Sequence, residues 1–361
     1  MKIAISAAET SGDLIASALV KSLLKCQPDC QIEGLVGDKM SDAGCHRLWH
    51  IDQANVMGLS EVVNKLPSLL RLRNSIVKYF SENKPDVFIG VDSPDFNFKI
   101  EHKLKQCGVK TVHFISPSVW AWRSNRIKKI KASTDLILCL FPFEVDFYEK
   151  HGQRALFVGH PLTEKLQPRQ NYKPSKKVLL MPGSREAEIK SLLPELLSTV
   201  NLMREQDSKI QFSLALANDH FKVWVEERIN KLGIELSVGD AYVKIAQSDL
   251  VIVASGTATL EIALLGVPMV VVYKLSSVSY QIVKRLLNTK FISLPNVILG
   301  KEVVPELIQD NANGKNIANV SMQIIVSNNS KLVSELRKIH TQLHQESSAQ
   351  SAKAILEFVN E

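Results

Sequence analysis

Hydrophobic and polar residues alternate along this chain in a pattern that predicts strands and helices in turn. Short runs rich in β-branched residues predict buried strands. These runs are KIAISA (2–7), DVFIGV (86–91), KTVHFI (110–115), DLILCL (135–140), KVLLM (177–181), FSLAL (212–216), DLVIVA (249–254) and PMVVVY (268–273). Stretches with helical spacing lie between them, as in LIASALVKSLLK (14–25). Unbroken apolar strands alternating with helices are typical of parallel sheets covered on both faces, so we predict an α/β, doubly wound architecture.

The alternation pauses in GHPLTEKLQPRQNYKPSKK (159–177), which contains three prolines and no apolar period. Such a segment predicts an interdomain linker. We therefore expect two Rossmann-like domains, residues 1–160 and 177–330, with polar-rich C-terminal helices over 331–361 that can pack back on the N-terminal domain. Two such domains facing each other would place the carboxyl ends of both sheets around a central cleft, where open α/β sheets bind ligands.

Composition and charge narrow the class of protein. The 361 residues are 45% hydrophobic and 22% charged, as in ordinary globular chains. The net charge of +7 favours an anionic partner, and nucleic acid, membrane lipid and a phosphorylated substrate all fit that sign. Five cysteines without a C-x-x-C pair argue against a disulfide framework and a zinc site, and predict reduced thiols and a cytoplasmic protein. Because Glu9 and Asp13 interrupt the first apolar run and no run approaches membrane-spanning length, we expect neither a signal peptide nor a membrane span.

Two candidate motifs follow strands in the N-terminal half. In AAETSGD (7–13), the residues Glu9, Ser11 and Gly12 can form a tight loop beside a substrate, or simply begin a helix. The motif is not G-x-G-x-x-G, so dinucleotide binding is poorly supported. In GVDSPDFN (90–97), a carboxylate at the strand end can take a proton from an attacking hydroxyl. Asp92 is the preferred base because Asp95 follows a proline and suits a helix cap.

Two further segments combine apolar and basic residues. SPSVWAWRSNRIKKIK (116–131) joins Trp120 and Trp122 to five cations, Arg123, Arg126, Lys128, Lys129 and Lys131. This is either a solvated basic helix face or a site for a phosphate or lipid headgroup. MGLSEVVNKLPSLLRLRNSIVKYF (57–80) reads as a basic amphipathic helix interrupted by Pro67. Such a helix either packs in the core or lies in a membrane interface, and the candidate membrane contacts are Leu66, Leu69, Leu70, Leu72 and Arg73.

Two strand-to-helix turns in the C-terminal half predict an anion site. LLMPGSREAEI (179–189) turns through Gly183 and Ser184 to Arg185, at the positive end of a helix. VASGTATLEIALLGVPMV (253–270) repeats the arrangement with Ser255, Gly256 and Thr257, followed by Glu261. Together they suit a diphosphate, with the carboxylate on ribose hydroxyls, although ordinary turns of a Rossmann-like domain remain the alternative. With no Asp-x-Asp and no histidine cluster, we expect no metal and no cofactor, and the charge of the leaving group would rest on helix dipoles and Arg185.

Eight motifs occur in the order seen in lipid-A-disaccharide synthases, which the chain resembles from about residue 3 to residue 310. They are ETSGD, GVDSPDFN, SPSVWAWR, LFPFE (140–144), VGHPL (158–162), PGSR, ASGTATLE and SLPN (293–296). The resemblance implies a GT-B type, two-domain, inverting glycosyltransferase of Gram-negative lipid A biosynthesis. Its expected reaction joins UDP-2,3-diacylglucosamine to 2,3-diacylglucosamine 1-phosphate, giving a β-1,6-linked disaccharide 1-phosphate and UDP.

The resemblance also assigns expected roles to residues. Asp92 would be the general base on the acceptor 6-hydroxyl, and the UDP diphosphate would lie at Gly183–Arg185 and Ser255–Thr257 with Glu261 on the ribose. Asn296 would contact the donor, whereas His160 in GHPL has a structural alternative. The acceptor side would include Glu9, Ser11, Gly12, Asp95, Trp120 and Arg123, with the basic cluster meeting the 1-phosphate. Residues 57–80 would contact the inner leaflet, consistent with a peripheral protein on the inner face of the inner membrane, and a homodimer is the assembly considered.

Two other functions are weighed against this one. A UDP-N-acetylglucosamine 2-epimerase, or another sugar-nucleotide enzyme of the same fold, would need no acyl pocket. A nucleic-acid-binding protein would use residues 120–131, and its affinity would fall steeply with salt. We expect no nucleic-acid partner.

Overall fold

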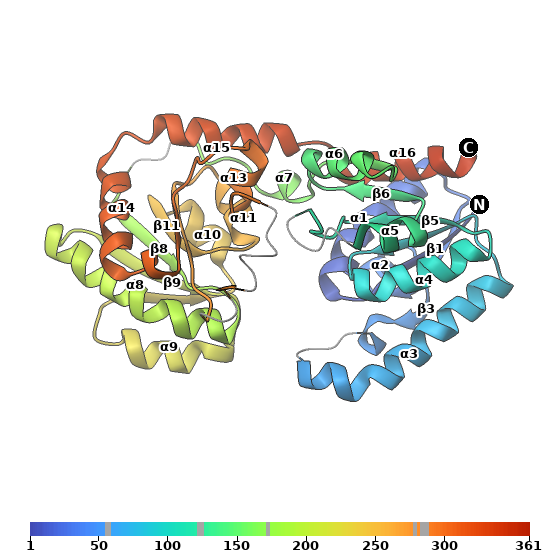
Figure 1. The fold of residues 1–361 in the computed structure, drawn as a ribbon, viewed down its shortest axis with the longest axis horizontal. Helices are drawn as coiled ribbons and strands as arrows, with labels where there is room; N and C mark the ends of the chain where they lie inside the picture. Colours follow the sequence, from blue (N-terminus) through green and yellow to red (C-terminus); the bar gives the residue numbers. More distant parts are fainter. Residues whose placement is uncertain (55–58, 121–125, 171–173, 277–279, 282–288) are drawn as a thin grey trace. The chain divides into compact units, whose positions relative to one another are not determined.

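The chain folds into two compact units (Figure 1), each described here by itself. Unit 1 comprises Met1–Pro161 and Leu343–Glu361, and unit 2 comprises Leu162–Gln342. The computed structural model describes the chain except residues 55–58, 121–125, 171–173, 277–279 and 282–288, and the side chains of 59–65. No helix in these described parts is both long and apolar enough to cross a membrane.

Unit 1 contains a seven-stranded parallel sheet in the order β3-β2-β1-β4-β5-β6-β7. The strands are β1 (Lys2–Ala7), β2 (Gln31–Val36), β3 (His46–His50), β4 (Val87–Val91), β5 (Lys110–Phe114), β6 (Leu136–Cys139) and β7 (Ala155–Phe157). The helices are α1 (Thr10–Cys26), α2 (Asp38–Asp42), η1 (Ile51–Gln53), α3 (Leu59–Glu82), α4 (Pro94–Gln106), α5 (Ile127–Ser133), α6 (Pro142–Lys150) and α16 (Ser347–Asn360).

Successive residues of the central strands supply two separate cores, because side chains alternate between the faces of a sheet. Ile3 and Ile5 pack with α1 and α16 on one face, whereas Ala4 and Phe88 pack with α3 and α4 on the other. Burial on both faces explains the unbroken apolar runs of these strands. The C-terminal α16 belongs to unit 1, where Lys110 Nζ donates to the carbonyl oxygens of Phe358 (3.0 Å) and Val359 (2.8 Å).

Unit 2 contains a six-stranded parallel sheet in the order β10-β9-β8-β11-β12-β13. The strands are β8 (Lys177–Met181), β9 (Gln211–Leu216), β10 (Glu235–Val238), β11 (Leu250–Ala254), β12 (Met269–Tyr273) and β13 (Glu306–Ile308). The helices are α7 (Leu162–Lys165), α8 (Glu186–Gln206), η3 (Asp219–Phe221), α9 (Lys222–Ile229), α10 (Ala241–Ala246), α11 (Ala258–Leu264), α13 (Leu294–Leu299), η4 (Gln309–Asn311), α14 (Gly314–Val326) and α15 (Ser330–Leu343). The two doubly wound, Rossmann-like sheets confirm the predicted fold class.

The predicted linker differs from the observed boundary. The change of unit falls after Pro161, and the following residues pack within unit 2. Arg169 N donates to Leu265 O at 3.0 Å, and His340 Nε2 lies 3.1 Å from Thr163 O. Prolines interrupt helices and strands but do not prevent a segment from packing against a domain. The proline content of 159–177 therefore indicated roughly where the units meet, but not the residue at which one unit ends.

Each sheet has a point at which the strand order reverses. In unit 1, β1 lies between β2 and β4, and in unit 2, β8 lies between β9 and β11. The loops that leave neighbouring strands at such a point diverge to opposite faces of the sheet, which opens a crevice at the carboxyl ends of the strands. The two reversal points are therefore β1/β4 and β8/β11.

Candidate functional site

The β1/β4 reversal point of unit 1 brings together the first two motifs predicted from the sequence. Glu9 precedes α1, and Ser93 follows β4. Ser93 Oγ donates a hydrogen bond of 2.9 Å to Glu9 Oε1, although the two residues are 84 positions apart. Asp92 and Ser93 both adopt left-handed backbone angles, with φ of 50° and 43°. Because this conformation costs non-glycine residues energy, neighbouring groups must hold it in place.

Asn97 provides that restraint, and the sequence reading missed it. Its side chain is fully buried and its amide donates to Val91 O (3.1 Å) and Asp92 O (2.9 Å). Ser6 Oγ donates in turn to Asn97 Oδ1 at 2.8 Å. These contacts fix the backbone that carries the Asp92 carboxylate. A polar residue at an inward-facing position, one turn into α4, was the available signal.

The other acidic residues of these motifs have structural contacts. The buried Asp13 carboxylate accepts from the backbone N–H groups of Gly37 (2.9 Å), Lys39 (3.0 Å) and Met40 (3.2 Å), so it caps α2. Asp95 is exposed, and its carboxylate lies 3.3 Å from Arg126 Nη1. Ser11 is exposed and Gly12 is buried. Asp92 is thus the carboxylate of this motif that lies at the strand end itself.

Trp120 is held by a buried carboxyl group. Trp120 Nε1 donates to Glu144 Oε1 at 3.1 Å, and the ring packs edge-to-face on Phe143 with centroids 4.7 Å apart. Glu144 Oε2 also accepts from Phe141 N at 3.1 Å. Burial raises the pKa of Glu144 from an ordinary 4.5 to about 8, and these hydrogen bonds oppose the shift only in part. Arg123, also expected here, lies outside the described residues.

The raised pKa of Glu144 predicts a pH-dependent stability. Between pH 4.5 and about 8 the folded state holds one proton that the unfolded state has lost, so the free energy of unfolding falls as pH rises through this window. The loss is on the order of a few kcal/mol, at about 1.4 kcal/mol per pKa unit. Denaturant titrations at several pH values should show this slope in the wild type and a shallower one in Glu144→Gln. Glu101, whose buried carboxyl also has a raised pKa, contributes equally to both proteins. Identical slopes would contradict the assignment.

The β8/β11 reversal point of unit 2 carries the predicted anion-binding turns. Gly183 has φ of 108°, a conformation that suits glycine. Glu188 Oε2 accepts from the backbone N–H groups of Ser184 (3.2 Å) and Arg185 (3.4 Å), and Arg185 Nη1 lies 3.3 Å from Glu188 Oε1. The Arg185 side chain is 80% exposed. A carboxylate of the protein therefore caps the amino end of α8, in the arrangement of a capping box, and uses the N–H groups predicted to bind an anion.

The neighbouring turn after β11 is less free than predicted. Ser255 N donates to Val272 O (3.0 Å) and Ser255 Oγ to Ile292 O (2.8 Å), so both of its donors have protein partners. Gly256 and Thr257 are exposed. Tyr242, which the sequence reading did not single out, places its hydroxyl 3.4 Å from Glu261 Oε1, and burial raises the pKa of Glu261. Gly256, Thr257 and Glu261 remain the accessible candidates on this side.

Asn296 is not available to a ligand, which corrects the expected donor contact. Its side chain is fully buried. The amide donates to Val304 O and Glu306 Oε1, both at 2.8 Å, while Oδ1 accepts from Val303 N (2.7 Å) and Val304 N (3.0 Å). All of its hydrogen-bonding capacity is used within unit 2. Asn296 therefore has a structural role in joining α13 to the segment before β13.

The predicted membrane contacts on helix α3 lie partly on its exposed face and partly on the face that packs against the core. Leu66 and Leu70, four residues apart, are 49% and 37% exposed. Leu72 is only 7% exposed and packs in the core with Ile76 and Phe80, so the expectation that it contacts a membrane is wrong. Helical spacing places Leu72 on the face that covers the sheet. Leu69 packs partly against the same core, and Arg73 is half-buried.

The described residues form neither a cluster suited to a metal ion nor a disulfide bond. Among these residues, no group of three or more histidine, cysteine, aspartate or glutamate residues is placed to hold a metal ion. Each of the five cysteines is a free thiol, three of them buried. His160 packs beside Phe141, with ring centroids 5.4 Å apart.

Comparisons with known proteins distinguish between the glycosyltransferases and the epimerases that share this fold. The sequence profile of the family described as lipid-A-disaccharide synthetase matches residues 3–359. The chain is 40% identical to the lipid-A-disaccharide synthase of Pseudoalteromonas translucida (strain TAC 125), with 100% of this chain and 98% of that protein covered.

Among solved structures, CalG4, the calicheamicin glycosyltransferase, superposes with a TM-score of 0.61 at 15% identity, over 100% of this chain and 98% of its own. The UDP-GlcNAc 2-epimerase of Neisseria meningitidis, bound to UDP-GlcNAc, gives 0.63 at 13% identity and covers all of both chains. At such low identity these two matches establish a shared GT-B architecture alone, whereas the family profile discriminates between the functions.

Proposed function

The chain belongs to the lipid-A-disaccharide synthase family, and on that premise we propose an inverting transfer from UDP-2,3-diacylglucosamine to 2,3-diacylglucosamine 1-phosphate. The products would be the β-1,6-linked lipid A disaccharide 1-phosphate and UDP. The observation that carries this proposal is the Asp92 loop. A strand-end aspartate at a reversal point is held in a left-handed conformation by the buried Asn97 amide. Such restraint is expected where a carboxylate must be presented to a substrate.

The proposed chemistry is a single displacement. Asp92 takes the proton of the acceptor 6-hydroxyl while the oxygen of that hydroxyl forms a bond to the anomeric carbon of the donor sugar. The bond from that carbon to the diphosphate oxygen breaks, and UDP leaves with the electron pair. Attack from the face opposite the α-linked diphosphate gives the β configuration, and no enzyme nucleophile is needed.

The donor diphosphate is proposed to bind unit 2 at Gly183, Ser184 and Arg185. The backbone N–H groups there already hold the Glu188 carboxylate, so a diphosphate would displace it or share Arg185 with it. Gly256 and Thr257 lie in the exposed turn after the adjacent strand β11. Glu261, beside the Tyr242 hydroxyl, would accept from the ribose.

The acceptor and its membrane are proposed to meet unit 1. At the β1/β4 reversal point Glu9 precedes α1, Ser11 and Gly12 lie in its first turn, and Asp95 lies in the first turn of α4. Trp120 is held in unit 1 by its hydrogen bond to Glu144. Exposed Leu66 and Leu70 supply an apolar contact for the inner leaflet, at the inner face of the inner membrane.

Release of UDP tests the proposal against an epimerase of the same fold. We expect release to require both acylated substrates and to proceed in EDTA, because helix dipoles and Arg185 would carry the leaving-group charge. The measurement is a coupled UDP assay in detergent, with and without chelator. Release without the acceptor would favour hydrolysis or epimerase-type chemistry. Complete loss in EDTA that magnesium restores would overturn the metal-free mechanism.

A further inference from the structure

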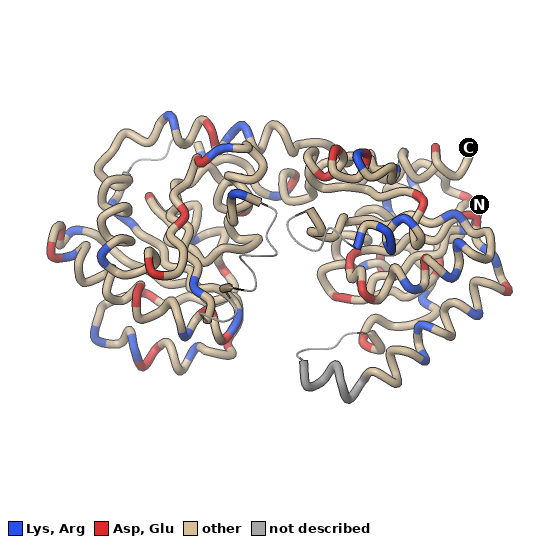
Figure 2. The backbone as a smooth tube through the Cα atoms, viewed as in Figure 1, with Lys and Arg blue, Asp and Glu red and all other residues tan. Residues whose placement is uncertain are grey.

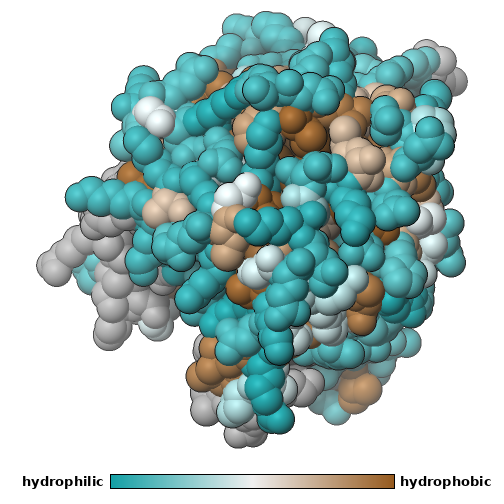
Figure 3. All heavy atoms as spheres, turned by 90° about the vertical axis from the view of Figure 1, so that its right-hand side faces the viewer, coloured by the Kyte–Doolittle hydropathy of each residue, from teal (hydrophilic) through white to brown (hydrophobic). Residues whose placement is uncertain are grey.

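A pocket of about 670 Å³ lies within unit 1, among α3, α4, α5 and the loop after β5. We call it the basic-rimmed pocket. Its apolar side chains are Val77, Phe98, Val119 and Ile130. Its cations are Arg73, Lys78, Lys99, Lys103, Arg126 and Lys129. Figure 2 shows the basic residues along these three helices, and the face in Figure 3 is largely hydrophilic with apolar side chains in small islands.

Helical spacing places apolar and cationic groups side by side. On α4, Phe98, Lys99, His102 and Lys103 line the pocket at positions i, i+1, i+4 and i+5, which form one helix face. On α3, Arg73, Asn74, Val77 and Lys78 repeat the same spacing. An apolar surface bordered by cations on two helices matches an amphiphile that has both a hydrocarbon chain and a negative charge.

The cations of the pocket lack matching negative charge. Asp95 is the one carboxylate among the lining residues, and it pairs with Arg126 at 3.3 Å. Within the described ranges, the other five cations form no ion pair with a carboxylate of the protein. Mutual repulsion among uncompensated cations disfavours the unliganded state and attracts an anion. Lysine and arginine are the side chains that proteins commonly use to bind phosphate.

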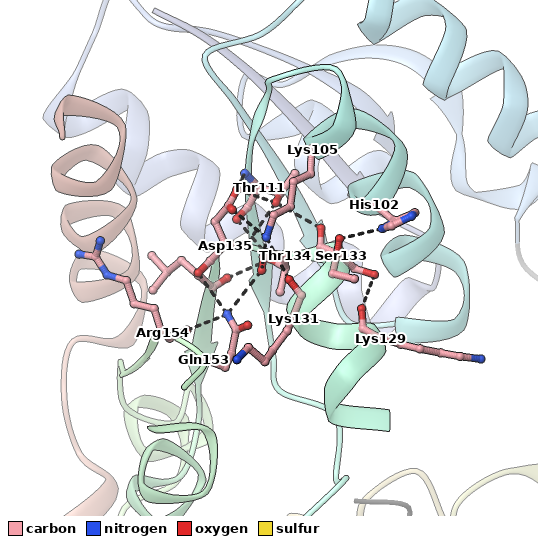
Figure 4. A network of polar contacts seen from close by, with 12 residues as sticks. His102, Lys105, Thr111, Lys129, Lys131, Ser133, Thr134, Asp135, Gln153 and Arg154 are labelled. Atoms are coloured by element: carbon pink, nitrogen blue, oxygen red, sulfur yellow. Dashed lines mark hydrogen bonds and ion pairs between the residues drawn. The ribbon is translucent and has the colours of Figure 1, made fainter. Parts of the chain in front are cut away.

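The wall formed by α5 is fixed in place before any ligand binds. Lys105 Nζ lies 2.9 Å from Asp135 Oδ1 and donates to Lys131 O (3.0 Å) and Thr134 O (3.1 Å). His102 Nδ1 lies 2.7 Å from Ala132 O. These contacts tie the end of α5 to α4, and Figure 4 shows the Lys129 side chain pointing away from the network. A preorganised wall lowers the entropic cost of binding.

We propose that the basic-rimmed pocket binds the acceptor, with an acyl chain on Val77, Phe98, Val119 and Ile130 and the 1-phosphate on Lys99, Lys103 and Lys129. The inference rests on the proposed function, because that function supplies an acylated sugar phosphate. Pro94 and Asp95 line the pocket, and Asp92 precedes Pro94 by two residues, so an acceptor held here would border the segment that carries the proposed base.

Equilibrium binding of a short-chain, monomeric 2,3-diacylglucosamine 1-phosphate tests the pocket by calorimetry. The variant is K99Q/K103Q, and its matched control is K21Q/K25Q, two exposed lysines with the same spacing on α1. The first should weaken binding by about tenfold or more, whereas the control should stay within about twofold of wild type. With the dephosphorylated 2,3-diacylglucosamine, both double variants should match wild type. In the wild type, each methylene removed from the buried chain should weaken binding by about fourfold.

Several outcomes would overturn the proposal. Equal losses in both double variants would mean that general charge attracts the ligand, and equal losses for both ligands would exclude phosphate recognition. Affinity independent of chain length would exclude an acyl site. Loss of binding to phosphatidylglycerol vesicles with unchanged affinity for the monomeric ligand would make the pocket a membrane contact. Binding without any disaccharide product would refute the proposed function but not the proposed binding site. Formation of the product together with unchanged acceptor affinity in K99Q/K103Q would refute the binding site but not the proposed function.

Discussion

Replacing Asp92 by asparagine should lower turnover by about a hundredfold or more, the usual contribution of a general base. The substitution keeps the side-chain shape and the Asn97 contacts to the Asp92 backbone carbonyl, while it removes the group that accepts the proton. Affinity for UDP should not change, because the proposed donor site lies in unit 2. The measurement pairs steady-state turnover with UDP titration of the same preparation.

Asp95→Asn is the comparison that assigns the base. Asp95 has the same charge three residues further along, but it is exposed and paired with Arg126. Its loss should cost far less turnover than the loss of Asp92. Near-normal turnover in Asp92→Asn would remove Asp92 as base, and a larger defect in Asp95→Asn would move that role to Asp95.

Replacing Arg185 by alanine should weaken UDP binding by about ten- to a hundredfold, the range for a lost hydrogen bond to a charged group. The side chain is 80% exposed and free to turn from Glu188 to a diphosphate. Titration with UDP measures the loss. Arg185→Lys should recover part of the affinity, because lysine supplies the charge without the planar fork. Unchanged binding in Arg185→Ala would move the diphosphate elsewhere on the protein.

Most of the central strands were predictable from the sequence, whereas the edge strands and the interior strand β2, whose QIEGLV sequence is interrupted by Glu33 and Gly34, were not. The runs at 86–91 and 249–254 became β4 (Val87–Val91) and β11 (Leu250–Ala254), both fully buried. By contrast β3, β10 and β13 lie at sheet edges or ends and have polar or half-exposed residues, so they leave no unbroken apolar run. Burial on two faces, which produces the signal, is missing there.

The sequence located motifs better than it located roles. Strand-end position marked Asp92 as a candidate base, whereas Asn97 on α4 acts through contacts such as its hydrogen bond with Ser6 on β1, which form only after folding. The SLPN motif marked Asn296 without showing that the fold uses all its hydrogen bonds. Leu72 was grouped with Leu66 and Leu70 because the sequence does not show which face of α3 packs on the sheet, and only the fold reveals that Leu72 is buried. The basic-rimmed pocket joins three helices that are separate in the sequence, so no single motif revealed it.

The identity of the product tests the proposed function most directly. Purified protein would be incubated with UDP-2,3-diacylglucosamine and 2,3-diacylglucosamine 1-phosphate in detergent, followed by mass spectrometry and measurement of the anomeric coupling by NMR. We predict a tetraacyl disaccharide 1-phosphate with a β linkage that forms only when both substrates are present. An α-linked disaccharide would contradict the single displacement with Asp92 as base. No disaccharide from folded protein that binds UDP would contradict the proposed function itself.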